Sequence, residues 1–140
     1  MYLIRLIYAS RVHESLNTED VAQILDSSRA NNSRSHITGL LCFNHKYFLQ
    51  CLEGSRAKVN ELYQRILHDE RHGDVLLLSY DEVAQRHFSK WSMGYVPATK
   101  ITEEITLKFT GNGKFNPYEM SGSSAEALLV ELASRTPTLE

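Results

Sequence analysis

Residues 3–9 form a strand-like segment that is apolar at odd and even positions alike. Ile4 and Leu6 fall on one face of such a strand, and Leu3 and Ile7 fall on the other. A sheet with helices on only one side shows polar residues on its open face. The sequence therefore predicts that both faces of the sheet containing this strand are covered.

The next part of the chain predicts an alternation of helices and strands. Asn17 and the acids after it are typical of a helix start, and that helix should run to about residue 32. Ser55 should cap a second helix that ends near residue 68. Further strands are predicted at residues 37–43, 47–53, 75–83 and 90–96. This β-α-β-β-α-β-β order predicts an α+β, ferredoxin-like fold with one extra strand, two helices on one face, and the first and third strands in the interior.

Pro97 marks a predicted boundary between a domain of residues 1–97 and a C-terminal helical extension, residues 98–140. The apolar residues of the extension fall into two groups, namely Ile101, Ile105, Leu107 and Phe109, then Ala125, Leu128, Leu129 and Leu132. We expect one or two helices, separated by a loop at 111–117. They should cover the second face of the sheet, contact a partner, or do both.

The charge balance and the cysteine content exclude several classes of protein. The 140 residues carry 15 Lys and Arg against 17 Asp and Glu, so electrostatics give no reason to expect nucleic-acid or membrane binding. No apolar run is long enough to span a bilayer, and the N-terminus lacks the pattern of a signal peptide. Cys42 and Cys51 are too few for a disulfide framework and are expected to be buried thiols. We expect a cytoplasmic protein.

The sequence contains none of the common enzyme motifs. It has no phosphate-binding glycine loop, no GxSxG, no HExxH and no CxxC. His68 and His72 have helical spacing but no third metal ligand in view, so we interpret them as surface residues. An acylphosphatase-like hydrolase remains an alternative, with Ser10 and Arg11 as its faint anion-binding candidate. An RNA-binding module of similar topology is another, although it would need exposed aromatics and a basic surface. We predict that the chain is not an enzyme.

Polar side chains occupy positions that should be apolar. Gln50 lies in the middle of a strand suited to the interior, where an unpaired amide costs about 1–3 kcal/mol. Tyr8 lies at the end of the neighbouring strand, and its phenol needs a partner when buried. Each has an ordinary explanation, because Gln50 can pair with backbone and Tyr8 can be an amphipathic strand end.

The predicted first helix changes character along its inner face. Its stripe continues from Ile24 through Ser28 to Asn31 and Asn32, which could also be a simple helix end and loop. Together with Ile66 on the second helix, these residues would form apolar walls and amide edges around a flat slot. Such a slot suits a planar heterocycle with carbonyls and ring nitrogens better than a phosphate or a metal.

Across residues 2–97 the sequence resembles the BLUF family of flavin-binding blue-light sensors. The matching segments are Leu6-Ile7-Tyr8-Ala9-Ser10, Asn31-Asn32, Ile37-Thr38-Gly39-Leu40-Leu41, Phe48-Leu49-Gln50, Leu52-Glu53-Gly54 and Trp91-Ser92-Met93. Their order and spacing match the family with almost no gaps. The length and the helical tail are similar to those of short members without a fused enzyme domain.

The resemblance implies a cofactor and a role for each site residue. The cofactor would be FAD, with FMN or riboflavin as possible substitutes. The family's pattern implies that the flavin-binding residues are Tyr8, Ile24, Ser28, Asn31, Asn32, Gln50, Arg65, Ile66 and Asp69. Tyr8 would be the photochemical donor and Gln50 would bridge it to the ring.

The same resemblance implies an output without catalysis. Transient oxidation of Tyr8 would let the Gln50 amide rotate or tautomerise, which gives a reversible, red-shifted signalling state. Trp91 and Met93, on the last predicted strand, would relay the signal, or would simply pack in the core. A separate downstream protein would receive it, and the chain would form a homodimer or a higher homo-oligomer.

Overall fold

The computed structural model describes residues 2–13, 17–97 and 103–135. Its elements are β1 (Leu3–Val12), α1 (Thr18–Ser35), β2 (Thr38–Phe43), β3 (Tyr47–Ser55), α2 (Arg56–Leu67), β4 (His72–Glu82), β5 (Gly94–Pro97), α3 (Glu103–Phe109), the short 3-10 helix η2 (Pro117–Glu119) and α4 (Gly122–Arg135). The five strands form one sheet in the order β4-β1-β3-β2-β5. This order confirms the predicted ferredoxin-like α+β fold, with β1 and β3 inside the sheet and β5 as the extra strand.

The helices of the first layer begin where the sequence predicts them. Asn17 and Asp20 form a capping box, in which each side chain accepts a hydrogen bond from the other residue's backbone N–H at 2.9 Å. The helix α1 ends at His36, whose φ of 57° is left-handed. It therefore extends beyond the predicted end near residue 32. As a consequence, the two asparagines belong to the helix rather than to a loop.

The register of the central strands decides which side chains share a face. In the antiparallel β1–β3 pair, Tyr8 lies opposite Gln50 and Ile7 lies opposite Cys51. Because side chains alternate along a strand, Tyr8 and Gln50 face one side of the sheet while Ile7 and Cys51 face the other.

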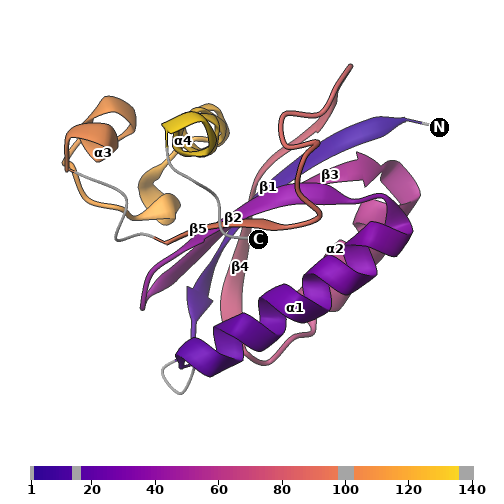
Figure 1. Ribbon diagram of the computed structural model, residues 1–140. Helices are drawn as coiled ribbons and strands as arrows, with labels where there is room; N and C mark the ends of the chain where they lie inside the picture. The colour runs from indigo at the N-terminus through magenta and orange to yellow at the C-terminus, as the bar shows by residue number, and fades with distance from the viewer. Residues whose placement is uncertain (1, 14–16, 98–102, 136–140) are drawn as a thin grey trace.

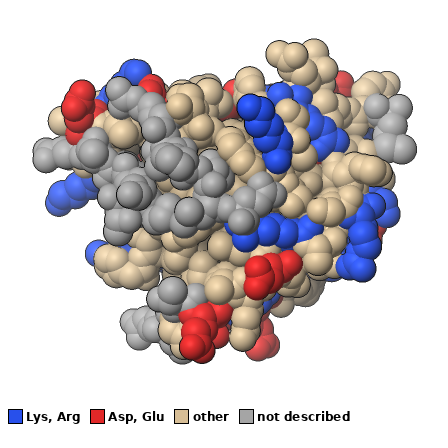
Figure 2. Space-filling view, viewed as in Figure 1, with Lys and Arg blue, Asp and Glu red and all other residues tan. Residues whose placement is uncertain are grey.

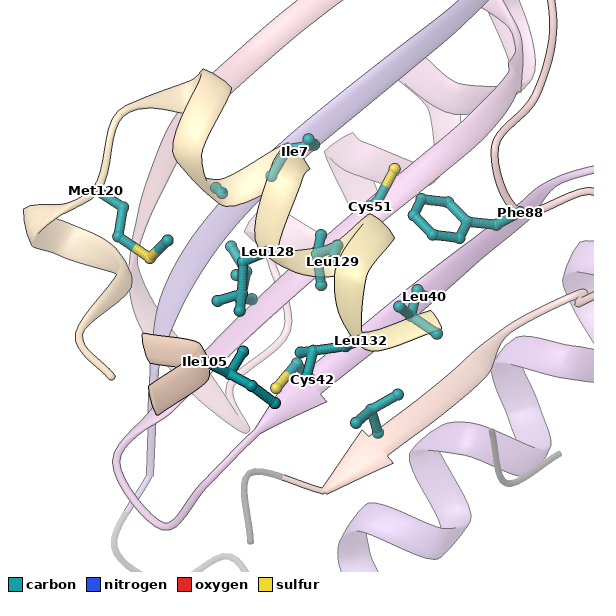
Figure 3. Close-up of a cluster of buried hydrophobic side chains, with 13 residues drawn as sticks. Ile7, Leu40, Cys42, Cys51, Phe88, Ile105, Met120, Leu128, Leu129 and Leu132 are labelled. Carbon is teal, nitrogen blue, oxygen red and sulfur yellow. The ribbon is translucent and has the colours of Figure 1, made fainter. Parts of the chain in front are cut away.

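Each face of the sheet has its own helical layer and its own core (Figure 1). α1 and α2 pack on the face of Tyr8, with Leu6, Leu41 and Leu52 in that core. On the other face, α4 contributes Ala125, Leu128, Leu129 and Leu132, all fully buried (Figure 3). Ile105 of α3 joins this second core. The prediction that a C-terminal helical segment covers the second face is confirmed, while Ile101 lies outside the described residues.

Two strand predictions were wrong in their limits. β4 starts at His72 rather than at 75 and includes Gly73, whose backbone pairs with Arg11 of β1. The last strand was predicted at 90–96 but comprises only Gly94–Pro97, which pairs in parallel with β2. Trp91 and Met93 therefore lie before the strand, in an irregular segment. No helix among the described residues is long and apolar enough to cross a membrane.

Candidate functional site

A pocket opens between α1, α2 and the face of the sheet that carries Tyr8. It has a volume of about 870 Å³, including its open mouth. The lining residues are Tyr8, Ile24, Ser27, Ser28, Asn31, Asn32, Leu41, Phe48, Gln50, Leu62, Arg65, Ile66, Asp69, Arg71 and His72. All nine residues predicted to hold the cofactor are in this set. Five of the lining residues are apolar and come from both helices and the sheet, and the polar ones converge on the same space, as in a site for a small molecule.

The floor of the pocket contains a hydrogen-bonded pair of side chains. The Tyr8 hydroxyl donates to Oε1 of Gln50, so the buried amide pairs with a side chain rather than with backbone. Burial raises the pKa of the Tyr8 phenol well above its usual range, and the nearby Asp69 and Tyr63 act in the same direction. Tyr8 therefore stays protonated and acts as the donor in this pair.

The other end of the Gln50 amide contacts Met93, in the segment before β5. Nε2 of Gln50 donates to the Met93 sulfur at 3.3 Å, and Met93 is fully buried. Trp91, two residues earlier, instead packs against the core under α4, with its ring 6.5 Å from that of Phe88. Met93 and Trp91 thus contact opposite cores, and Met93 is the residue at Gln50 in this structure.

The C-terminal half of α1 holds the chain around Met93. Asn32 is buried and donates from Nδ2 to the carbonyl oxygen of Ser92 at 2.7 Å. Arg29 donates to the carbonyl oxygen of Met93 at 3.0 Å. Asn31 is half-buried, and its side-chain oxygen accepts from Arg34 at 2.6 Å. The amide-rich end of α1 therefore lines the pocket and also fixes the segment that leads into β5.

The rim of the pocket between α2 and β4 carries charge. The Asp69 carboxylate accepts hydrogen bonds from the Arg71 side chain, and these bonds hold the pKa of Asp69 below its usual value. His72 hydrogen-bonds through Nε2 to the Ile66 carbonyl oxygen at 2.8 Å and through Nδ1 to Ser10 at 2.7 Å. Since a carbonyl only accepts, Nε2 carries the proton. The ring links the end of α2 to the sheet.

Six lining residues were not predicted to line the site: Ser27, Leu41, Phe48, Leu62, Arg71 and His72. A signal was available for Phe48, because it shares a strand face with Gln50 two residues later. The interpretation of His72 as a surface residue was wrong. It is half-buried in β4 and does not share a helix with His68, which ends α2.

The structure gives the hydrolase alternative no support. Ser10 is fully buried and is bonded to His72, while Arg11 pairs with Asp74 at 3.3 Å. Within the described part of the chain, no cluster of His, Cys, Asp and Glu has the arrangement of a metal site. The face in Figure 2 shows blue and red side chains together rather than one sign of charge.

Comparison with known families decides the identity of this fold and site. The profile of a family described as sensors of blue light using FAD matches residues 3–94. The chain belongs to the BLUF family. It is a BLUF blue-light sensor domain, and BLUF domains bind flavin.

Individual relatives place the chain within the BLUF family. The photoactivated state of BlsA matches with a TM-score of 0.89 at 30% identity, over 99% of both chains. A Klebsiella pneumoniae BlrP1 structure with FMN and cyclic diGMP has a TM-score of 0.68 at 32% identity, over 73% of this chain and 27% of that one. The blue light- and temperature-regulated antirepressor BluF of Escherichia coli (strain K12) is 32% identical over 65% of this chain and 23% of its own length.

The lengths of these relatives differ from that of this chain. The chain spans 10–23% of the length of the first curated relatives that it matches, which include a photoactivated adenylate cyclase subunit of Euglena gracilis. The parts of the cyclases that carry their catalytic domains lie outside the match. The similarity to BlsA, in contrast, extends over nearly the full chain.

Proposed function

We propose that this chain is a non-catalytic blue-light photoreceptor in which Tyr8 and Gln50 are the photoactive residues. The observation that carries the proposal is the hydrogen bond from Tyr8 to Gln50 on the floor of the pocket, with Met93 on the other end of the same amide. One side chain therefore contacts both the proposed donor and the proposed relay.

The residues of the pocket fit a flavin by their chemistry. Ile24 of α1 and Ile66 of α2 can form apolar walls for a flat ring. Gln50 and the α1 asparagines supply amide donors and acceptors for ring carbonyls and nitrogens. Arg65 and Asp69 lie on the α2 side, where the ring carbonyl and the ribityl chain would be held.

We infer that the light reaction changes the hydrogen-bond arrangement of the Gln50 amide. On absorbing blue light, a bound flavin supplies a strong one-electron oxidant. Tyr8 would give up an electron and its phenolic proton to the bound flavin, which would remove the donor that orients Oε1 of Gln50. The amide then rotates or tautomerises, and the electron and the proton return to Tyr8. No bond is permanently changed, so the result is a switch between two hydrogen-bond arrangements.

The test is an absorption difference spectrum of the FAD-loaded protein under blue light. We expect a reversible red shift in the wild-type protein, and we expect Tyr8→Phe and Gln50→Leu to abolish it. Tyr47→Phe is the matched control, because Tyr47 is a half-buried tyrosine outside the pocket and should leave the shift intact. Colourless protein that ignores added flavin would contradict the proposal.

FAD is the cofactor that we propose, with FMN and riboflavin as substitutes. The family is described as using FAD, whereas the BlrP1 structure contains FMN. Titrating the flavin-free protein with each of the three, with flavin fluorescence as the readout, would rank them. Equal affinities would show that the pocket recognises only the ring and not the rest of FAD.

We propose that the output passes to a separate protein in the cytoplasm. Residues 1–97 would form the sensor domain and residues 98–140 its helical extension, with Trp91 and Met93 as the relay between them. The Escherichia coli relative is named an antirepressor, which is consistent with action on a protein partner. We also propose a homodimer or a higher homo-oligomer, and light scattering coupled to size-exclusion chromatography would measure it.

A further inference from the structure

A fully buried carboxylate lies in the sheet, close to the relay segment. Glu53 of β3 has no exposed surface, and each of its two oxygens accepts two hydrogen bonds. Oε2 accepts from Arg5 at 2.9 Å and from the backbone N–H of His87 at 2.7 Å. Oε1 accepts from the backbone N–H of Phe88 at 3.0 Å and from the Thr38 hydroxyl at 3.2 Å. Removing a charge from water is costly unless it is paired and hydrogen-bonded, and here both conditions are met.

Two of these donors are consecutive backbone groups at the start of the segment that contains the proposed relay residues. From there the chain is fixed step by step, because the N–H of Trp91 donates to the carbonyl oxygen of Phe88 at 3.2 Å. The carbonyl oxygen of Trp91 in turn accepts from the N–H of Gly39 on β2 at 3.1 Å. The position of Trp91 therefore depends on a turn that the Glu53 carboxylate holds.

The same ion pair reaches the C-terminal helix. Arg5 donates to the carbonyl oxygen of Gln85 at 3.0 Å and lies 3.9 Å from the carboxylate of Glu126 on α4. The other oxygen of Glu126 lies 3.5 Å from the His87 ring. Glu53 and Arg5 thus connect the two central strands, the loop at residues 85–88 and α4.

We propose that Glu53 is a positioning residue that anchors residues 85–93, so that Met93 is held at Gln50 and Trp91 is held under α4. The anchor itself does not depend on flavin, whereas its role in passing a light signal rests on the proposed function. Buried ion pairs can often be replaced by apolar side chains without loss of stability. A packing role alone would therefore not need a carboxylate, whereas orienting two adjacent N–H groups does.

Trp91 is the single tryptophan of the chain, so its fluorescence reports the position of the segment without any label. The test compares flavin-free wild type with Glu53→Gln, which keeps the shape but places an NH₂ group against a donor. We expect the Trp91 emission to shift to the red and acrylamide quenching to rise about twofold, because the segment opens more often. Glu126→Gln is the matched control, since it neutralises a carboxylate beside the same Arg5 and the His87 ring and, among the described residues, bonds to no backbone N–H of the segment. It should leave the Trp91 spectrum unchanged.

An unchanged Trp91 spectrum in folded Glu53→Gln would overturn the proposal, and so would an equal change in Glu126→Gln. If Glu53→Gln does not fold, Thr38→Val decides: it removes the hydroxyl donor to Oε1, together with the acceptor of the Arg86 side chain, and should produce a smaller shift in the same direction. No shift in that variant would also count against the anchor.

The FAD-loaded protein tests the role in signalling separately. After illumination ends, the red-shifted spectrum returns to the dark spectrum. Glu53→Gln should change the rate of this return about threefold or more, since Met93 is held less firmly at Gln50, while the dark flavin spectrum itself stays the same. An unchanged recovery rate would contradict a role in signalling. If no flavin binds, the proposed function fails. The Trp91 fluorescence of the flavin-free protein still shows whether Glu53 anchors residues 85–93.

Discussion

The two faces of the sheet use alternate residues of the same strands and differ in how they are filled. On β3, Leu49 and Cys51 face α4, whereas Phe48 and Gln50 face α1 and α2. On the α4 side, the chain's own apolar side chains form a fully buried core over the centre of the sheet (Figure 3), and a second pocket opens only at its edge, between residues 87–91 and α4. On the α1 and α2 side, part of the space is left as a pocket lined by a phenol and amides.

This difference separates stability from function within one small domain. A close-packed face cannot change a side-chain position without loss of contacts. A face with a cavity leaves room for a ligand and for the rotation of an amide. The α4 face should therefore contribute most of the stability of the flavin-free protein, and the pocket face should gain stability only when its ligand binds.

The largest effect that we expect is on the filled face. Leu129→Ala removes a fully buried side chain of α4 and leaves a cavity, so it should lower the free energy of unfolding by about 2–5 kcal/mol. Urea denaturation of the flavin-free protein would measure this. A loss below about 1 kcal/mol would show that the α4 face is not the main source of stability.

The next effect concerns the pocket face alone. FAD at about 100 times its dissociation constant should raise the free energy of unfolding by about 2.7 kcal/mol, because a ligand that binds only the folded state stabilises it. Thermal melts at increasing FAD concentrations would show this as a rising Tm. The gain should be the same in Leu129→Ala, provided that the two faces contribute independently. A smaller gain in that variant would show that they are coupled.

The same substitution on the pocket face should cost less. Leu62 lines the pocket and is half-buried, so Leu62→Ala in the flavin-free protein enlarges an existing space rather than creating a cavity. We expect a loss of about 1 kcal/mol, compared by urea denaturation with that of Leu129→Ala. Equal losses in the two variants would contradict the difference between the faces.

The smallest effect on the free energy of unfolding should come from the Asp69–Arg71 ion pair at the rim of the pocket. The Arg71 side chain lowers the pKa of Asp69 in the folded state, so the stabilisation is present above the unfolded pKa of about 4 and is lost as the pH falls through the folded value. Because Asp69 is partly exposed, the stabilisation from this ion pair should stay below about 1 kcal/mol. Asp69→Asn should remove this part of the acid dependence in urea titrations between about pH 5 and 2. An unchanged pH profile would show that the ion pair does not contribute.

Periodicity predicted the sheet and the approximate position of the pocket. The apolar pattern on both faces of β1 required a second helical layer, which α4 provides. Strand alternation and helix spacing brought Tyr8, Gln50 and the inner face of α1 to one side. These are local patterns, with periods of 2 and 3.6 residues, and they can be read without knowledge of distant contacts.

The parts that could not be predicted are those fixed by distant partners. The predicted strand at 90–96 starts only at Gly94, because the chain before it follows a turn in which the backbone N–H groups of His87 and Phe88 bond to Glu53, more than 30 residues earlier in the chain. His72 was misjudged because it was interpreted together with His68 at helical spacing, whereas it starts β4, next to Gly73, which pairs with Arg11. The separation of Met93 and Trp91 onto opposite cores follows from this irregular segment and not from a strand.

The short last strand, β5, should unfold locally more readily than the centre of the sheet. β5 has four residues and, among the described strands, pairs only with β2, in the parallel arrangement, which is slightly less stable per residue than the antiparallel one. β1 has ten residues and is paired on both sides. Amide hydrogens of β5 should therefore exchange with solvent through local fluctuations, while those of β1 exchange only on global unfolding. We therefore expect the strand that directly follows the proposed relay residues to separate from the sheet while the rest of the domain stays folded.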